Sequence, residues 1–571
     1  MTASLIQVIR QRHRRMNSGN IKRMFFAGAV LLGFIALAIP AHAQISVTVD
    51  ANQVRAVMPL EGLGMHTSVY SNQFGNALLD DRLIEAGIGA LRYSGGGYAD
   101  VYHWSVHKLT PWSDGVYGYI GPNTDFGKFS QLLTASNTQA VITVNYGSGL
   151  QWNAGHTQLI APSTGASPKE AAAWVAYANG NPTDTTSIGV DNLGNDWKTV
   201  GYWANLRTLT AAQNPDNQYD FLAIDHDAPF GIKYWEIGNE TFGTGYYDGS
   251  DGYSINYDVP YDGTNRLGNP NLSPAHYGQE VNQYSAAMKA VDPNIKIGAV
   301  VTTPPGDYSW DMYAGKRWSS EVLAVSAQNI DFVIAHWYPN AGTNANGTSL
   351  LSQVGTTIPL MINGTTPGQD TGTSAGIRDW IAAAGGSPDT EIFITEFGYT
   401  GSLSGLVKNS VTAAFVADSY ATWLDLGVTN VDYLELTGKD FLSDGESLTR
   451  GAAFYAIQMV DKMAEPGDDI LTTSSGASTL RSHAALQDDG KVAVMLVNDS
   501  TLSATMYVSI NGDTMTADGT RYSTTGTSFN TTSVSGLGNT FTVTVPGRTI
   551  YEYLLTPIAQ VNATWNLTGD G

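Results

Sequence analysis

The chain of 571 residues is long enough to bury a large core and to hold more than one domain. Its apolar content of 42% and charged content of 14% exclude a disordered chain. The net charge of −22 at pH 7 argues against nucleic acid or anionic lipid as a partner, and the absence of cysteine excludes disulfides, thiolate metal sites and a cysteine nucleophile.

The first segment of the chain has the pattern of a secretory signal. A basic stretch ends at Arg23, an apolar run covers residues 24–39, and Ala41-His-Ala43 then supplies an Ala-x-Ala cleavage site. We expect residues 1–43 to be removed, so that the mature protein is secreted or periplasmic with no stable membrane insertion. The apolar run is short for a membrane span, and an uncleaved anchor is the alternative.

After the signal, strand patterns alternate with helical patterns. Residues 45–49 alternate apolar and polar side chains, as a half-buried strand does. Seven short apolar runs in the middle of the chain have the composition of buried strands, and several are separated by helical patterns. The predicted strands are 88–93, 140–145, 232–237, 295–301, 332–336, 392–395 and 431–436, and the predicted helices are 168–178, 274–291, 374–384 and 410–426.

This alternation predicts an α/β fold with a parallel sheet, and its length favours an eight-stranded (β/α)8 barrel over residues 58–462. A doubly wound sheet is the alternative, but no glycine-rich phosphate loop follows an early strand. Residues 463–558 are rich in Thr, Ser, Val and Gly without helical periodicity, which predicts an accessory antiparallel β-sandwich. We expect the N-terminal strand within 44–57 to join this sandwich, and 559–571 to form a flexible tail.

Two glutamates follow predicted strands at positions that suit catalysis. Glu240 and Glu396 each close a short apolar run and are followed by glycine-containing loop sequence. The carboxyl ends of the strands form the catalytic face of an α/β-barrel. Two carboxyl groups, one acid and one base or nucleophile, are the minimum required to hydrolyse a glycosidic bond. Without further signals, however, an Asn-Glu pair after a strand is most often the solvated start of a loop.

Four motifs resemble those of retaining glycoside hydrolases of clan A and occur in the same order. Tyr234-Trp-Glu-Ile-Gly-Asn-Glu240 resembles the acid/base strand, and Thr395-Glu-Phe-Gly398 resembles the nucleophile strand. Leu91-Arg-Tyr-Ser-Gly-Gly-Gly-Tyr-Ala-Asp100 is similar to the second-strand motif of families 39, 51 and 79, although Ser94 stands where these families more often have Pro. Ala335-His-Trp-Tyr-Pro339 is similar to the sixth-strand motif. The resemblance covers about residues 55–460.

The resemblance implies a role for each member of the pair. Glu240 is expected to be the general acid and then the general base, and Glu396 the nucleophile. The spacing of the two glutamates along the chain fits their placement on the fourth and seventh barrel strands. Because the nucleophile must stay anionic, a cation and a phenol should lie close to it, and Arg92 and Tyr338 are the candidates. Arg92 could instead close a purely structural ion pair.

Further residues are candidates for binding the substrate. Asn239 is expected to donate a hydrogen bond to the sugar 2-hydroxyl. His336 is either a buried core histidine or a hydrogen-bond donor near the second carboxylate. Asn145 follows a predicted strand, and Trp104 and Trp337 are candidate sugar platforms whose burial by packing is equally expected.

The sequence therefore predicts a secreted retaining glycoside hydrolase that cleaves plant or microbial polysaccharide or oligosaccharide through a covalent glycosyl-enzyme. The Trp-Glu-Ile-Gly-Asn-Glu form favours an α-L-arabinofuranosidase, whereas Thr-Glu-Phe-Gly is nearer to β-glucuronidase-like and β-xylosidase-like relatives. A non-catalytic carbohydrate-binding surface protein is the alternative from another class. Carbohydrate is the expected partner. We expect no cofactor and no metal, since no His/Asp/Glu cluster has metal-ligand spacing in the sequence.

Overall fold

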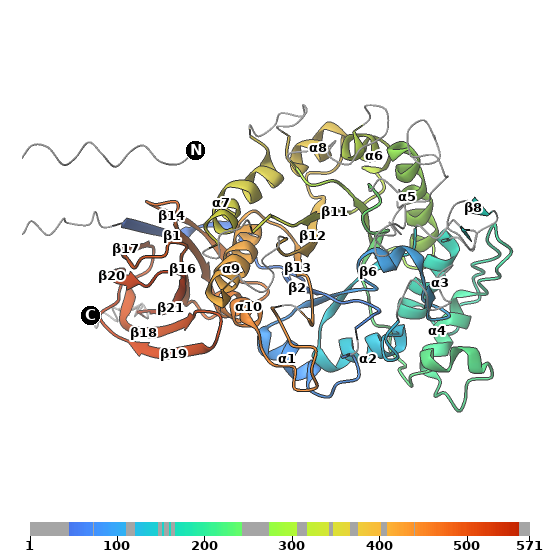
Figure 1. The fold of residues 1–571 in the computed structure, drawn as a ribbon. Coiled ribbons are helices and arrows are strands. Elements are labelled where there is room, and N and C mark those ends of the chain that lie inside the picture. Colours follow the sequence, from blue (N-terminus) through green and yellow to red (C-terminus); the bar gives the residue numbers. More distant parts are fainter. Residues whose placement is uncertain are drawn as a thin grey trace, which may run out of the picture. The chain divides into compact units, whose positions relative to one another are not determined.

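The computed structural model describes residues 45–71, 73–109, 120–146, 166–242, 273–304, 317–341, 347–365, 375–400, 408–438 and 440–558, and the backbone alone of β7 (Gln151–Trp152) and β8 (Leu159–Ile160). Figure 1 draws the fold. The predicted signal and the predicted tail lie outside the described residues. In the part of the chain that is described, no helix combines the length and the apolar character needed to cross a membrane.

Eight parallel strands close into a barrel, which confirms the predicted fold class. Hydrogen-bonded pairing continues around the ring until β13 pairs with β2, where Val431 lies opposite Leu63. In chain order the barrel strands are β2 (Leu63–His66), β3 (Ala90–Tyr93), β6 (Gln139–Val144), β9 (Tyr234–Ile237), β10 (Lys296–Val300), β11 (Phe332–Trp337), β12 (Glu391–Phe397) and β13 (Asn430–Tyr433).

The first barrel strand, β2, was not predicted from the sequence. It has four residues, all buried, and no run of β-branched side chains marks it. At Gly64 a Cβ atom would lie 1.8 Å from Oδ1 of Asp432, on the neighbouring strand β13. Glycine is therefore required for β2 to pair with β13 and close the barrel.

The helices surround the barrel (Figure 1). The four predicted helices are present with small shifts at their ends. Two of them, α3 and α5, begin with a serine cap followed by proline: Ser167 accepts from the backbone N–H of Lys169, and Ser273 from that of His276. The helices are α1 (Leu79–Ala86), α2 (Phe126–Ser136), α3 (Pro168–Asn179), α4 (Val200–Thr208), α5 (Pro274–Lys289), α6 (Trp318–Ser326), α7 (Thr348–Asn363), α8 (Ile377–Ala383), α9 (Asn409–Asp425) and α10 (Ala452–Met463), with 3-10 turns η1 (Gly97–Val101) and η2 (Asn217–Leu222) and the hairpin of β4 (Tyr102–His103) and β5 (Lys108–Leu109).

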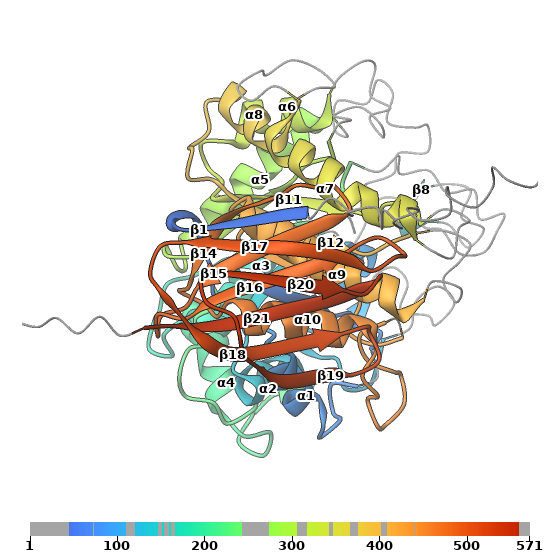
Figure 2. The same cartoon turned by 90° about the vertical axis from the view of Figure 1, so that its left-hand side faces the viewer.

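The C-terminal region and the N-terminal strand β1 form one nine-stranded sheet, which Figure 2 shows face on. The sheet curls so that Phe541 of β20 packs against Tyr553 of β21, with ring centroids 5.0 Å apart, and it encloses a core of its own. The strands are β1 (Ile45–Val57), β14 (Asp469–Ser475), β15 (Leu480–Leu486), β16 (Val492–Asn498), β17 (Ala504–Asn511), β18 (Met515–Thr524), β19 (Phe529–Val534), β20 (Thr540–Val545) and β21 (Thr549–Pro557).

The N-terminal strand β1 belongs to this sheet, as predicted. It lies between β14 and β17, where Val47 faces Ser475 on one side and Val508 on the other. Pairing with β14 is antiparallel and pairing with β17 is parallel, so the sheet departs from the wholly antiparallel form that was expected.

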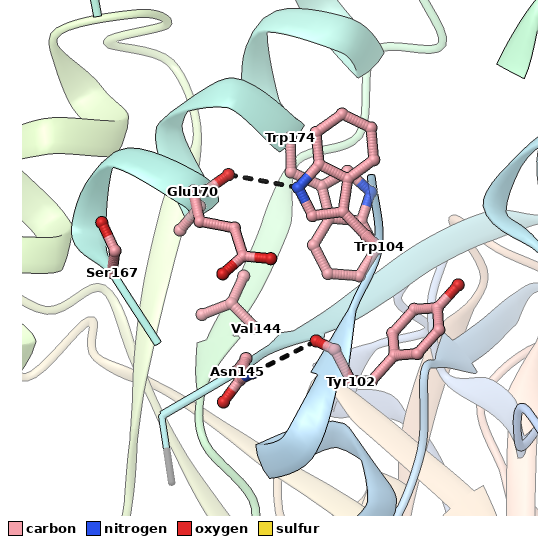
Figure 3. Close-up of a pocket in the computed structure, with 8 residues that line it drawn as sticks. Tyr102, Trp104, Val144, Asn145, Ser167, Glu170 and Trp174 are labelled. Carbon is pink, nitrogen blue, oxygen red and sulfur yellow. Dashed lines mark hydrogen bonds between the residues drawn. The ribbon is translucent and has the colours of Figure 1, made fainter. Parts of the chain in front are cut away.

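Of the two interpretations of Trp104 and Trp337, sugar platform and core packing, the structure supports core packing. Trp104 is fully buried, stacks on Trp174 of α3 with centroids 5.5 Å apart, and donates from Nε1 to the carbonyl of Glu170 (Figure 3). Trp337 is 4% exposed and packs on Phe415 and Trp423 of α9. Neither ring face is available to a sugar.

A buried ion network joins α9 to the sheet. Nε2 of His483 on β15 lies 2.8 Å from Oδ1 of Asp418, and its Nδ1 lies 2.9 Å from Oδ2 of Asp425. Arg481 donates to Asp418 from the same strand, and Arg55 of β1 lies 3.8 Å from Asp425. Burial would lower the pKa of His483, but the two aspartates outweigh burial and raise it to about 9.

We expect this network to make the protein less stable at alkaline pH. A histidine whose pKa is raised by folding stabilises fully below its unfolded value of about 6.5. That contribution, on the order of 3 kcal/mol, is lost as the pH rises through the folded value of about 9. Denaturant unfolding measured from neutral to alkaline pH should show this loss, and His483→Gln should be less stable at neutral pH with a flatter pH dependence. Parallel pH profiles for the two proteins would contradict the assignment.

Candidate active site

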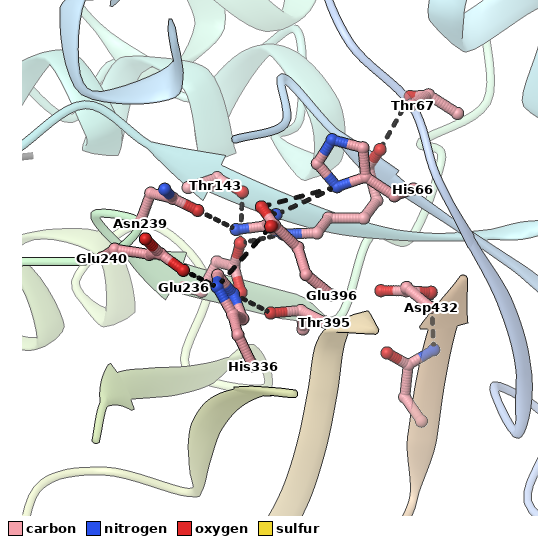
Figure 4. A network of polar contacts seen from close by, with 12 residues as sticks. His66, Thr67, Thr143, Glu236, Asn239, Glu240, His336, Thr395, Glu396 and Asp432 are labelled. Carbon is pink, nitrogen blue, oxygen red and sulfur yellow. Dashed lines mark hydrogen bonds and ion pairs between the residues drawn. The ribbon is translucent and has the colours of Figure 1, made fainter. Parts of the chain in front are cut away.

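Six of the nine predicted site residues meet at the carboxyl ends of the barrel strands, and Figure 4 shows four of them, Asn239, Glu240, His336 and Glu396. Glu240 follows β9 and Glu396 lies on β12, which are the fourth and seventh barrel strands in chain order. Around them the structure brings together Arg92 on β3, Asn239 after β9, His336 on β11 and Tyr338 directly after β11.

Arg92 connects three strands in this site. It is fully buried, and each guanidinium nitrogen meets its own partner: Nε donates to Glu236, Nη1 to Oε1 of Glu396 at 2.7 Å, and Nη2 to Oδ1 of Asn239 at 2.8 Å. Burial would lower the pKa of Arg92, but Glu236 and Glu396 raise it above its ordinary value. The planar guanidinium therefore remains charged and fixes the ends of β9 and β12 relative to β3.

Glu396 is held as an anion. Its Oε1 accepts from Arg92, and its Oε2 accepts from the hydroxyl of Tyr338 at 2.6 Å. Burial alone would raise its pKa, but His336 and Arg92, together with the Tyr338 hydroxyl, lower it well below the ordinary value. The cation and the phenol that were expected from the sequence are both in contact with this carboxylate.

Glu240 is the more open of the two carboxylates. Its side chain is 37% exposed, against 9% for Glu396. Oε1 of Glu240 lies 2.8 Å from Nδ1 of His336. One oxygen of each glutamate and a ring nitrogen of His336 all lie within 4.8 Å of one another. A shielded anion and an open carboxyl at this separation can act on the same bond of a bound molecule.

Comparison with known sequences supports the resemblance of the motifs. The chain is 24% identical over 263 residues to a probable α-L-arabinofuranosidase C from Aspergillus fumigatus, which covers 43% of this chain and 37% of the relative. It is 26% identical over 180 residues to an exo-α-(1→6)-L-arabinofuranosidase from Bifidobacterium longum, covering 31% of this chain and 28% of the relative. The match thus spans well under half the length of these relatives. No family model matches the chain.

Solved structures share the fold over nearly the whole chain. The α-L-arabinofuranosidase from Thermotoga maritima, in its arabinose complex, gives a TM-score of 0.61 at 16% identity over 90% of this chain and 100% of that chain. The family 51 arabinofuranosidase from Xanthomonas axonopodis pv. citri gives 0.63 at 16% identity over the same shares. Cel44A, a family 44 endoglucanase from Clostridium thermocellum, gives 0.58 at 15% identity over 90% of this chain and 100% of that chain.

The chain resembles the α-L-arabinofuranosidases of clan A. The two matched sequences are named as arabinofuranosidases, and so are two of the three structures. The family 44 enzyme shows that the barrel and the accessory sheet alone are shared more widely.

Glu240, His336 and Glu396 form a cluster that could offer a metal ion three ligands, which the spacing in the sequence did not reveal. The hydrogen bonds around Glu396 argue against such an ion. Both oxygens of Glu396 already accept, from Arg92 and from Tyr338, and the arginine would repel a cation bound beside it. The donors present suit a bare carboxylate better than a metal ligand.

The sequence interpretation missed two residues that shape the site. His66, at the end of β2, is fully buried and lies 3.8 Å from Oε1 of Glu396. Asp100, in η1, accepts from the backbone N–H of Tyr146 at 3.0 Å and from that of Asn239 at 2.9 Å. Asp100 thereby joins the ends of β6 and β9, and its place at the end of the second-strand motif was a signal that could have been used.

Asn145, a predicted substrate contact, follows β6 and is 5% exposed. Its Nδ2 donates to the carbonyl of Tyr102 at 3.3 Å, and its own carbonyl accepts from the hydroxyl of Tyr284 at 2.9 Å (Figure 3 draws the first of these). These contacts fix the chain where β6 ends. A contact of Asn145 with substrate stays a prediction.

Proposed function

We propose that the protein is a retaining glycoside hydrolase whose substrate is an α-L-arabinofuranoside. The observation that carries the proposal is the glutamate pair, with Glu240 open to solvent and Glu396 buried as an anion within 4.8 Å of it. Retaining enzymes hold their two carboxyls about 5–5.5 Å apart, whereas inverting enzymes leave about 6.5–9.5 Å for a water molecule. The shorter separation supports double displacement.

In the first step, an oxygen of Glu396 bonds to the anomeric carbon while Glu240 protonates the leaving oxygen and the glycosidic bond breaks. In the second step, Glu240 takes a proton from water, the water oxygen bonds to the anomeric carbon, and Glu396 is released as a carboxylate. Arg92 holds Asn239 by its amide oxygen, which directs the amide nitrogen, a donor, to the sugar 2-hydroxyl.

The choice of sugar rests on the relatives, which are named for α-L-arabinofuranosides. A glucuronide is less well supported, because a uronate needs a cation and Arg92 is already engaged by Glu236, Glu396 and Asn239. A β-xyloside remains the alternative within the clan. We also propose that the enzyme acts outside the cytoplasm, on the basis of the signal pattern in residues 1–43.

The test is a panel of aryl glycosides: α-L-arabinofuranoside, β-D-xyloside, β-D-galactoside and β-D-glucuronide. We expect the arabinofuranoside to be cleaved fastest, and NMR of the first product formed to show retained anomeric configuration. An inverted product would refute double displacement. Sugar binding without hydrolysis of any member would favour the non-catalytic carbohydrate-binding alternative.

Asp100→Asn should lower kcat while leaving the fold intact. The amide keeps one acceptor oxygen, but its NH2 group then faces a backbone N–H of either Tyr146 or Asn239. A small displacement of Glu240 follows, and misplacement by about 1 Å can cost on the order of 10²-fold in rate. Steady-state kinetics measures the change in kcat, and thermal unfolding checks that the fold is intact. Unchanged kcat would show that β9 is positioned without Asp100.

A further inference from the structure

Two histidines flank Glu396, and their partners give them opposite charge states. Nδ1 of His66 lies 3.1 Å from Nη1 of Arg92. Because an arginine can only donate, Nδ1 of His66 must accept and carries no proton. Its Nε2, 3.1 Å from Oγ of Ser68, then holds the ring proton. Burial, with the charges of Arg92 and His336, outweighs Glu396 and lowers the pKa of His66 to about 3, so this ring is neutral.

Each ring nitrogen of His336 lies beside a group that can accept its proton. Nδ1 lies 2.8 Å from Oε1 of Glu240, and Nε2 lies 3.2 Å from Oγ1 of Thr395 (Figure 4). A carboxylate and a hydroxyl can both accept, so the ring fits a cation with a proton on each nitrogen. Burial would lower the pKa of His336, but Glu396 and Glu240 raise it above its ordinary value.

The charged and titratable groups around His336 come from five strands of the barrel. Glu240 at the end of β9 and Glu396 on β12 favour a cation, whereas Arg92 on β3 and the neutral His66 on β2 do not. Tyr338, on the same segment as His336, directs its proton to Glu396. The negative charge of Glu396, 3.7 Å from Nδ1, favours the cation together with Glu240.

We propose that His336 and Glu240 share the one proton that the reaction uses, and that the charge of Glu396 holds it there. The inference rests on the proposed function. In the free enzyme the proton lies between Nδ1 of His336 and Oε1 of Glu240. His336 is thus a positioning residue that acts through Glu240.

The proton leaves the pair when the charge of Glu396 is consumed. As an oxygen of Glu396 bonds to the anomeric carbon, the imidazolium loses one of its two counter-charges, and the proton passes through Glu240 to the leaving oxygen as the glycosidic bond breaks. In the second step a water proton returns to the pair, the water oxygen bonds to the anomeric carbon, and Glu396 regains its charge. The pair holds one proton in the free enzyme and none in the glycosyl-enzyme, so the cycle balances.

The kinetic test compares His336→Gln with His66→Gln, which replaces a neutral ring equally close to Glu396. For His336→Gln we expect the basic limb of the kcat/KM pH profile to move at least one pH unit to lower pH. We also expect the loss of rate to be at least ~10-fold larger for poor leaving groups than for activated ones. His66→Gln should leave the limb in place, whatever its effect on the rate. Thr395→Val, which removes the acceptor at Nε2, should give a smaller shift in the same direction as His336→Gln.

The spectroscopic test is the ring ¹⁵N NMR signal of His336, assigned by comparing the two variants. We expect both nitrogens to be protonated in the free enzyme at neutral pH, and a neutral ring after trapping with a 2-deoxy-2-fluoro aryl glycoside. If the wild-type enzyme hydrolyses a glycoside, either of two results would overturn the inference. These are a neutral His336 in the free enzyme and an unshifted basic limb in His336→Gln. Absence of wild-type turnover on every glycoside would instead refute the proposed function itself.

Discussion

Glu396→Gln is expected to abolish hydrolysis of aryl arabinofuranosides and to leave sugar binding in place. An amide cannot bond to the anomeric carbon and leave again, so the expected loss of kcat is on the order of 10⁴-fold or more. The substitution keeps the shape of the side chain and its acceptor for Tyr338 or Arg92. Kinetics, with calorimetric titration of arabinose, separates loss of chemistry from loss of binding.

The control for this variant lies on the same strand. Glu391 begins β12 and pairs with Lys296 at 2.7 Å, at the opposite end of the barrel from the site. Glu391→Gln should therefore retain turnover close to that of the wild type. Undiminished turnover in Glu396→Gln would show that Glu396 is not the nucleophile. An equal loss of turnover in both variants would indicate damage to β12 rather than to the site.

Arg92→Met should cost both activity and stability. The change leaves Glu236 and Glu396 buried without their shared cation, and removing one partner of a buried ion pair costs about 3–5 kcal/mol. Denaturant unfolding should show a loss of that size, and turnover should fall below detection because Glu396 and Asn239 lose their common anchor. Arg92→Lys should not restore either property, since one ammonium cannot reach the separate partners of Nε, Nη1 and Nη2.

Adding Glu236→Gln to the Arg92→Met variant separates the loss of stability from the loss of activity. Glu236 is fully buried and is partnered by Arg92 and by the hydroxyl of Thr143. In the Arg92→Met background, Glu236→Gln removes one unpaired charge, so part of the stability should return while turnover stays absent. If the double variant were no more stable than Arg92→Met, Glu236 would not carry a buried charge in the absence of the arginine.

The positions of Glu240, Glu396, Arg92 and Tyr338 could be predicted from the sequence because motifs that resemble those of clan A mark these residues and strand order then brings them together. In a parallel barrel the carboxyl ends of all strands meet on one face, so residues that end strands are brought together wherever they lie in the chain. The contacts of Glu396 with Arg92 and Tyr338 follow from that geometry and from the need of a buried carboxylate for donors.

His66, Trp104 and Trp337 show what local patterns leave undecided. His66 reaches Glu396 only because β2 closes the ring, and four residues without a β-branched run do not reveal a strand. Trp337 stands between His336 and Tyr338, and side chains alternate along a strand, so its direction away from the site was available from the sequence. Trp104 lies outside the barrel strands, and its packing on α3 depends on tertiary contacts that no periodicity encodes.

The place of β1 in the accessory sheet sets the order in which the chain can complete its fold during synthesis. Val47 pairs with Ser475 and Val508, which are made only when most of the chain already exists. Until then β1 is an unpaired strand with two open edges, prone to association with other chains. The barrel can assemble as its strands emerge, whereas the sheet must wait for the carboxyl-terminal residues. Truncation before Asp469, which removes both β14 and β17, should therefore leave the first strand without a partner and cause aggregation.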